Sequence, residues 1–303
     1  MHSKVKNQEE TNNVVTRACT KVIGFKQLYN RLKKKIVVSG KSPSTLNNYG
    51  RHMAQLALHF NCLPTELDKE QIEEYLFYLK NEIAPSESYF KFTVYGLRFL
   101  FRLEGLDDRI IQLPEIKRAN KLPAVLSREE IKALLKVPSL LKHRILLAII
   151  YGCGLRCMEV RQLLIKDVDF DRGMLHIRQG KGRKDRYVPL GKLLTKGLKD
   201  YLHNDKPNKW LFNGKDHHQE FSQRGVQWVL REAVKKTMIK KDVTVHTLRH
   251  SYATHLLEDG LDIVTIKELL GHERIETTMI YLHVARSGRK SAFSPLDTLY
   301  NLH

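Results

Sequence analysis

Four stretches in the first half of the chain place apolar residues three and four positions apart, which is the spacing of an amphipathic helix. The clearest follows Ser42 and Pro43, which are typical residues at a helix start. Its apolar positions are Leu46, Tyr49, Met53, Leu56 and Phe60. The pattern predicts a helical domain over residues 23–104, with helices near 25–38, 42–60, 68–79 and 89–103. Residues 1–22 lack this periodicity and are predicted to be a mobile lead-in.

The helical spacing stops between residues 105 and 126, where the chain carries Pro114 and Pro123. Basic residues also occur here, so the stretch is predicted to be a basic linker between two domains. Ser127 and Glu130 then form a capping-box pattern ahead of a new apolar helix, which indicates the start of a second domain. This domain is predicted to cover residues 127–290, with a C-terminal tail at 291–303.

Three short runs of strand type lie inside the second domain, at 168–170, 174–178 and 186–190. Turn-forming segments separate them, which predicts a three-stranded antiparallel sheet. Helical spacing predominates elsewhere, at 192–202, 222–237, 247–258 and 263–270, and a last helix is expected from Glu276 past Tyr281. The predicted fold class is therefore mainly α with a small three-stranded antiparallel sheet, so that the second domain is α+β.

Composition indicates a globular protein and argues against a membrane, secreted or disulfide-rich one. The 303 residues are 42% hydrophobic and 28% charged, as in ordinary globular proteins. No apolar run approaches the roughly 18 residues of a membrane span, and the polar opening does not resemble a signal peptide, so a cytoplasmic protein is expected. The four cysteines show no disulfide or zinc spacing.

The net charge is +19 and is spread over both halves of the chain. Residues 1–120 hold 19 basic and 13 acidic side chains, and residues 121–303 hold 33 and 20. Two basic domains favour an extended polyanion as the partner, and in the cytoplasm that polyanion is nucleic acid.

Nucleotide-binding and metalloprotease motifs are absent, so chemistry on a phosphate would depend on cationic side chains. Six residues occupy unusual local settings, at glycine-flanked turns or at helix starts and ends. They are Arg156, Lys181, His246, Arg249, His272 and Tyr281. Taken alone, each one is better explained as a capping, packing or solvating group than as a catalytic residue. Their joint occurrence in this order is what calls for a functional interpretation.

Four sequence blocks carry these residues: GLRCMEV from Gly154, GKGRKDRYVPL from Gly180, HTLRHSYATHLLEDG from His246 and LLGHERIETTMIYLHV from Leu269. In this order and over essentially the whole second domain, the chain resembles the tyrosine recombinase family, also called the phage integrase family. Cys157 and Met158 depart from the family pattern at positions with no direct chemical role. The first domain matches in helical pattern and length only.

The resemblance implies a two-domain DNA clamp, with a SAM-like helical domain in front of the catalytic domain. It implies that Arg156 and Arg249 hold the scissile phosphate and that Tyr281 forms a 3′-phosphotyrosyl bond. His246 would accept the tyrosine proton, Lys181 would protonate the leaving 5′-oxygen, and His272 would donate a hydrogen bond to the phosphate. His250 is expected to support the site rather than to take part directly. No cofactor or metal ion is implied.

Further basic residues are expected to contact the DNA backbone. They are Arg183, Lys184 and Arg186 on the strand connection, Lys117, Arg118 and Lys121 in the linker, and Lys91 and Arg98 on the fourth helix. The implied partner is double-stranded DNA with inverted-repeat recombination sites, bound by a homotetramer that is a monomer or dimer off DNA. Accessory DNA-bending proteins and association with the nucleoid are also expected.

The apolar tail, with Phe293, Leu296, Leu299 and Tyr300, either docks on a neighbouring subunit or folds back on its own domain. The biological role is predicted to be integration, excision or transposition of a mobile element. Chromosome dimer resolution of Xer type remains an alternative. So do a type IB topoisomerase-like enzyme and a non-catalytic DNA-binding protein.

Overall fold

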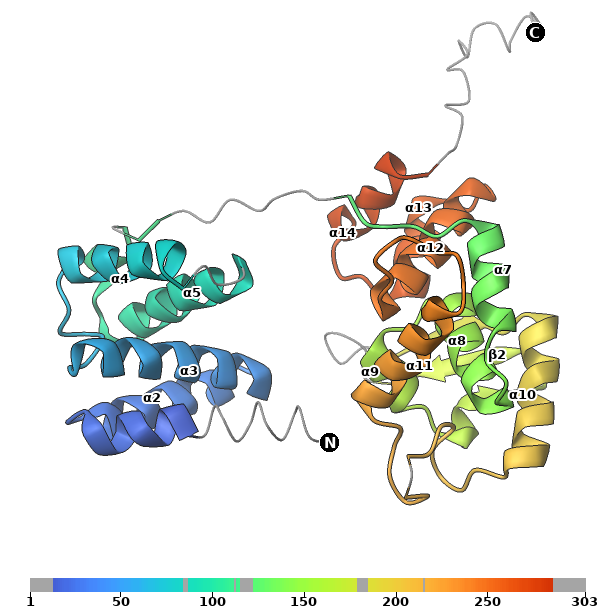
Figure 1. Cartoon of the computed structure of the whole chain (residues 1–303), viewed down its shortest axis with the longest axis horizontal. Helices are drawn as coiled ribbons and strands as arrows, with labels where there is room; N and C mark the ends of the chain where they lie inside the picture. The colour runs from blue at the N-terminus through green and yellow to red at the C-terminus, as the bar shows by residue number, and fades with distance from the viewer. Residues whose placement is uncertain are drawn as a thin grey trace, which may run out of the picture. The chain divides into compact units, whose positions relative to one another are not determined.

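The computed structural model describes residues 13–83, 87–111, 113–114, 122–178, 185–214 and 216–285. The chain divides into two compact units, residues 1–119 and 120–303, and the division falls inside the predicted linker (Figure 1). No helix in the described ranges is long and apolar enough to span a bilayer.

The first unit is built from helices, and capping side chains mark the starts of two of them, α3 and α4. Its named helices are α2 (Phe25–Val38), α3 (Pro43–Phe60), α4 (Lys69–Asn81), α5 (Glu87–Glu104) and α6 (Asp107–Ile111). The Ser42 hydroxyl accepts a hydrogen bond from the Thr45 amide at 3.2 Å at the start of α3. Asp68 and Gln71 form a reciprocal capping box at α4, with bonds of 2.8 and 3.0 Å. The predicted helices are therefore present close to their predicted limits.

The predicted mobile lead-in is wrong for residues 13–22. Residues 13–21 are helical, and Val15, Ala18 and Val22 are buried in the core of the first unit. These three residues follow helical spacing, but polar neighbours surround them and the run is too short to stand out. Packing against α2 and the rest of the core makes this helix stable, because an isolated helix of this length is marginal in water. Residues 1–12 lie outside the described part of the chain.

The first part of the predicted linker also belongs to the first unit. Helix α6 lies inside it, Leu113 is 6% exposed, and Leu106 and Ile110 pack against the core. Arg109 Nη1 donates to the carbonyls of Thr65 and Leu67 at 2.9 and 2.8 Å, which ties α6 to the loop before α4. The linker prediction is therefore wrong for residues 106–111 and for Leu113, because tertiary contacts stabilise a helix of only one turn.

The second unit combines helices with the predicted sheet. Its strands β1 (Val168–Asp169), β2 (Met174–Ile177) and β3 (Arg186–Pro189) are antiparallel and lie in the order β1-β2-β3. Leu175 pairs with Val168 on one side and with Val188 on the other. The helices are α7 (Arg128–Lys136), α8 (Leu141–Gly152), α9 (Cys157–Arg161), α10 (Lys192–Asp205), α11 (Gln223–Lys235), α12 (Val245–Glu258), α13 (Ile263–Leu270) and α14 (Glu276–Met279), with short 3₁₀ segments η1 (Ile165–Asp167) and η2 (Ile280–His283). The predicted fold class is confirmed.

Helix α8 is the centre of this unit. It is apolar on nearly all sides, as expected of a buried helix, and it packs against α7, α9, α10, α11 and α12. The helix ends where Gly154 takes a left-handed conformation with φ +60°. A Cβ atom there would lie 2.4 Å from the Tyr252 ring, so α12 approaches the backbone of this turn very closely. Helix α9 begins three residues after Gly154, and the apolar spacing did not predict it.

Replacing Gly154 with alanine should destabilise the protein strongly. The left-handed conformation and the collision with Tyr252 together are expected to lower the free energy of unfolding by about 3 kcal/mol. Gly260→Ala provides a matched control, because Gly260 has φ +90° and no neighbour within 4 Å of the added carbon. It should cost only about 1 kcal/mol. Equal losses in urea titrations of the two variants would contradict the close approach at Gly154.

Candidate active site

Two arginines, Arg249 buried and Arg156 partly buried, form the centre of the candidate site. Arg156 lies at the N-cap of α9, and Arg249 lies on α12, far from it in the chain. Arg249 donates to the Gly154 carbonyl at 2.7 Å and to the Leu270 carbonyl at 2.5 Å. Arg156 donates to the Gly271 carbonyl at 3.3 Å. The turns that follow α8 and α13 are thus held together by these guanidinium groups.

Glu159 lies between the arginines and is the carboxylate that balances them. Its oxygens accept from Arg156 Nη1 at 2.6 Å and from the Arg156 amide at 2.9 Å, and Arg249 Nη1 lies 3.6 Å away. Burial raises the pKa of this carboxyl, but Arg186 and Arg156 outweigh burial and lower it to about 2. Sequence reasoning missed this residue, although it stands three positions after Arg156 within the quoted block GLRCMEV.

Arg186 of β3, which was predicted to contact the DNA backbone, is bonded within the protein. Its two Nη atoms each donate to Glu159 at 2.9 Å, and its Nε donates to the Leu269 carbonyl at 2.8 Å. Its side chain is 10% exposed. The sequence showed only an arginine near a basic turn, whereas the fold supplies a buried carboxylate and a carbonyl for it. Arg186 thereby fixes β3 to the arginine cluster, and its contact with DNA stays a prediction.

Tyr281 reaches the same cluster from η2. Its hydroxyl lies 2.9 Å from His250 Nδ1, and the residue is 1% exposed. Burial raises the pKa of Tyr281, and the charges of Arg249 and Arg156 oppose that rise. Tyr281 packs in one buried cluster with Leu270, whose carbonyl accepts from Arg249. Tyr281, Arg156 and Arg249 are therefore brought together although they come from three different segments.

The two predicted histidines lie at the edge of this arrangement. The His246 ring is 6.3 Å from the His250 ring, centre to centre, and within the described ranges His246 has no hydrogen-bond partner. Burial and the nearby charges of Arg249 and Arg156 lower its pKa. His272 follows Gly271, and its Nδ1 lies 2.9 Å from the Thr278 hydroxyl. Both histidines border the arginine cluster, and their catalytic roles stay predictions.

The remaining predicted site residues are the lysine expected to act as the acid and the basic residues expected to contact DNA. Lys181, Arg183, Lys184, Lys117, Arg118 and Lys121 lie outside the described residues. Arg98 donates to the Pro114 carbonyl at 2.9 Å, and Lys91 lies on α5. The predicted DNA contacts of these residues stay predictions. Across the described segments, no three His, Cys, Asp or Glu side chains lie close enough together to hold a metal ion.

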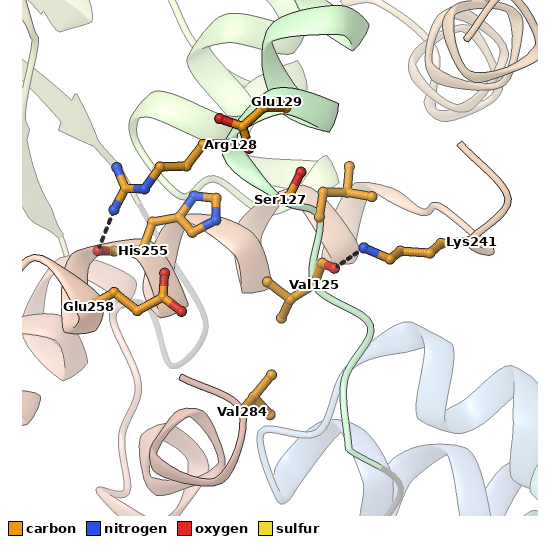
Figure 2. A pocket seen from close by; sticks show the side chains of 9 residues that line it. Val125, Ser127, Arg128, Glu129, Lys241, His255, Glu258 and Val284 are labelled. Carbon is orange, nitrogen blue, oxygen red and sulfur yellow. Dashed lines mark hydrogen bonds between the residues drawn. The ribbon is translucent and has the colours of Figure 1, made fainter. Parts of the chain in front are cut away.

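A separate pocket of about 380 Å³ lies beside α7 and the C-terminal half of α12. Figure 2 shows Arg128 bonded to the His255 carbonyl and Lys241 bonded to the Val125 carbonyl around it. Arg128 also pairs with Asp259 at 2.7 Å. These charged groups are already engaged with protein partners, and none of the six predicted catalytic residues lines the pocket. The arginine cluster is therefore the better candidate for chemistry.

Comparison with known proteins agrees with this geometry. Residues 124–287 match the phage integrase family, and residues 28–111 match the N-terminal SAM-like domain of phage integrases. The chain belongs to the phage integrase family of tyrosine recombinases. It is an enzyme that breaks and rejoins DNA, and the family predicted from the four sequence blocks is confirmed.

Two relatives illustrate how far the similarity extends. Tyrosine recombinase XerA of Thermococcus kodakarensis is 38% identical over 82% of this chain and 87% of its own length. Tyrosine recombinase XerD of Halalkalibacterium halodurans is 31% identical over 85% and 93%. Among solved structures, the crystal structure of XerA recombinase has a TM-score of 0.51 at 26% identity, covering 91% of this chain and 98% of its own. The integrase of transposon Tn1549 in complex with circular intermediate DNA shares the fold, with a TM-score of 0.66, 18% identity and the same two coverages.

Glu159→Gln should destabilise this recombinase by about 3 kcal/mol at pH 7, because it leaves three arginines around an uncharged group. The pKa of Glu159 is about 2 in the folded chain against an ordinary 4.5. The stabilisation is therefore complete above pH 4.5 and is lost as the pH falls towards 2. Urea unfolding at pH 7 and pH 3 should show the difference between wild type and variant shrinking at the lower pH.

Glu232→Gln is the matched control, because Glu232 pairs with Lys235 on the exposed surface of α11. Its effect on the free energy of unfolding should be small at both pH values. A Glu159→Gln variant as stable as this control would contradict the assignment of Glu159 as the counter-charge of the cluster.

Proposed function

We propose that this chain is a site-specific recombinase that cuts duplex DNA with Tyr281 and rejoins it without an added energy source. The observation that carries the proposal is that Arg156, Arg249 and Tyr281 meet at the turn after α13. The two arginines donate to the carbonyls of Gly271 and Leu270, and Tyr281 packs in the same buried cluster as Leu270. Guanidinium groups suit a phosphodiester because they are planar, remain charged and bind two oxygens at once. A tyrosine oxygen beside such a pair is positioned to attack the bound phosphorus.

The reaction proposed is an exchange of one phosphodiester for another. Tyr281 Oη forms a bond to phosphorus as the bond from phosphorus to the 5′-oxygen breaks, which leaves a 3′-phosphotyrosyl bond and a 5′-hydroxyl. Lys181 supplies the proton that the 5′-oxygen takes up. A histidine of α12 accepts the proton of Tyr281 Oη, and His272 donates a hydrogen bond to a phosphate oxygen. Attack by a 5′-hydroxyl of another strand reverses these steps and joins the new strand.

The cluster favours the transition state because negative charge builds up on the phosphate oxygens during attack. Arg249 has a side chain that is 3% exposed, and both its Nη atoms are already held by carbonyls. It therefore needs little rearrangement when the charge develops, and burial strengthens its effect. Glu159 balances part of the positive charge, so the three arginines can be held together before DNA arrives.

We further propose double-stranded DNA with inverted-repeat sites as the substrate, bound by a homotetramer on the nucleoid. The basic charge of both units supports a long contact with DNA phosphates. Solved relatives include XerH bound to its difH substrate in a pre-cleavage complex, with a TM-score of 0.59 and 26% identity over 79% of this chain and 75% of that chain. A tail that docks on the neighbouring subunit and accessory bending proteins complete this proposal.

The biological role we propose is integration, excision or transposition of a mobile element. The fold shared with the Tn1549 integrase is compatible with this role. Resolution of chromosome dimers is the second candidate, which the similarity to XerA and XerD favours. Genes beside this one would separate the two roles, because a mobile element carries its recombinase next to its own ends.

Tyr281→Phe should abolish covalent attachment to DNA and leave DNA binding nearly unchanged, because it removes only the attacking oxygen. The assay incubates wild type and variant with supercoiled DNA carrying the flanks of the gene, in EDTA, and stops the reaction with SDS. Tyr151→Phe is the control, since its hydroxyl also lies 2.8 Å from a histidine of α12, namely His255, outside the cluster. Adducts formed by the Tyr281→Phe variant would show that the nucleophile is another residue.

Lys181→Ala should slow cleavage roughly 100-fold if this lysine is the general acid. A substrate with sulfur in place of the bridging 5′-oxygen should restore the rate, because a thiol with a pKa of about 8.5 leaves without being protonated. The measurement is the single-turnover rate of adduct formation on the two substrates. Equal loss on both would remove Lys181 from the role of acid.

A further inference from the structure

His250 is the side chain that the fold places on the attacking oxygen. Its Nδ1 lies 2.9 Å from Tyr281 Oη, and the two rings are 5.7 Å apart, centre to centre. The contact joins α12 to η2, two elements that pack together along this part of the unit. Sequence reasoning gave His250 only a supporting role, and it gave the tyrosine proton to His246.

His246 is less suited to that task in this geometry. It stands four positions before His250 on the same face of α12, but the ring centres are 6.3 Å apart. Among the described residues no hydrogen bond links it to Tyr281, and the charges that act on it most are Arg249 and Arg156. His246 therefore lies within the influence of Arg249 and Arg156, whereas His250 contacts the hydroxyl of Tyr281.

We propose that His250, rather than His246, orients Tyr281 for attack and receives its proton. This deepens the proposed function and rests on Tyr281 being the nucleophile. As Oη bonds to phosphorus, its proton moves to Nδ1, and the 5′-oxygen leaves with a proton from Lys181. In the rejoining step the imidazolium returns its proton to Oη as the bond from Oη to phosphorus breaks.

The surroundings of His250 are compatible with this role. Burial, together with the charges of His246 and Arg249, lowers the pKa of His250 to about 4, so its ring is neutral at pH 7. With the ring proton on Nε2, the Nδ1 lone pair accepts from the tyrosine hydroxyl. The imidazolium formed during attack lies next to a phosphate that is gaining negative charge, which stabilises both.

Two substitutions separate proton transfer from orientation. Asparagine places an oxygen near the position of Nδ1, so His250→Asn keeps a hydrogen-bond acceptor for Tyr281 but cannot take up the proton. His250→Ala removes both functions and leaves space for an added imidazole molecule. Both variants should bind DNA as wild type does and form adducts about 100-fold more slowly. Imidazole in the buffer should restore His250→Ala at least 10-fold and should leave His250→Asn unchanged.

The measurement is the single-turnover rate of adduct formation on a nicked duplex that carries the cleavage site mapped with wild type. His255→Ala is the matched control, because His255 also holds a tyrosine hydroxyl through Nδ1 on α12, at 2.8 Å, away from the arginine cluster. It should cleave at the wild-type rate with or without imidazole. Thermal unfolding of each variant separates lost folding from lost chemistry, and rescue by imidazole shows in the same sample that the protein is folded.

The outcomes are distinct from those of the proposed function. If wild type forms no adduct, the proposed function fails, and the role of His250 fails with it. If wild type forms adducts and His250→Asn equals it, His250 only orients the tyrosine and the proton transfer is overturned. Rescue by imidazole of His246→Ala but not of His250→Ala would return the role to His246. Slow cleavage by both His250 variants, with rescue of the alanine variant alone, supports the proposal.

Discussion

The carboxylate of Glu159 is the interaction on which the rest of the catalytic unit depends. Three guanidinium groups, from the turn before α9, from β3 and from α12, surround a side chain that is 5% exposed. Positive charges so close together would repel one another in a medium of low dielectric. One buried carboxylate makes the arrangement stable, and its strongly lowered pKa reflects how firmly it is held in the charged form.

This arrangement also explains how distant segments are brought into one site. Arg156 and Arg186 donate to Glu159, and Arg249 lies beside it. All three arginines also donate to backbone carbonyls, which belong to Gly154, Leu269, Leu270 and Gly271. The ends of α8 and α13 are thereby fixed relative to α12 and β3. Tyr281 follows because η2 packs on α12, and the pairing with His250 sets the position of its hydroxyl. The charges that stabilise this unit are therefore also those proposed to hold the phosphate.

Close packing of backbone and side chain complements the charges. Gly154 lets the Tyr252 ring lie against the turn whose carbonyl binds Arg249, and Gly271 has φ +61° with Arg186 directly beside it. At both places a side chain would displace an arginine or the helix that carries it. Gly154 and Gly271 thus allow the close packing that the geometry of the cluster requires.

The sequence by itself determined the helices with strong periodicity, the three-stranded sheet, the family and the chain positions of Arg156, Arg249 and Tyr281. These features depend on local spacing and on motifs that a linear chain displays. Tertiary structure alone decided that residues 13–21 and α6 are ordered, because short helices are stable only when packed. It also decided that Arg186 binds Glu159 and that His250 meets Tyr281. Such pairings join residues 27 and 31 positions apart, and no periodicity or motif reports which buried partner a charged or polar group will find.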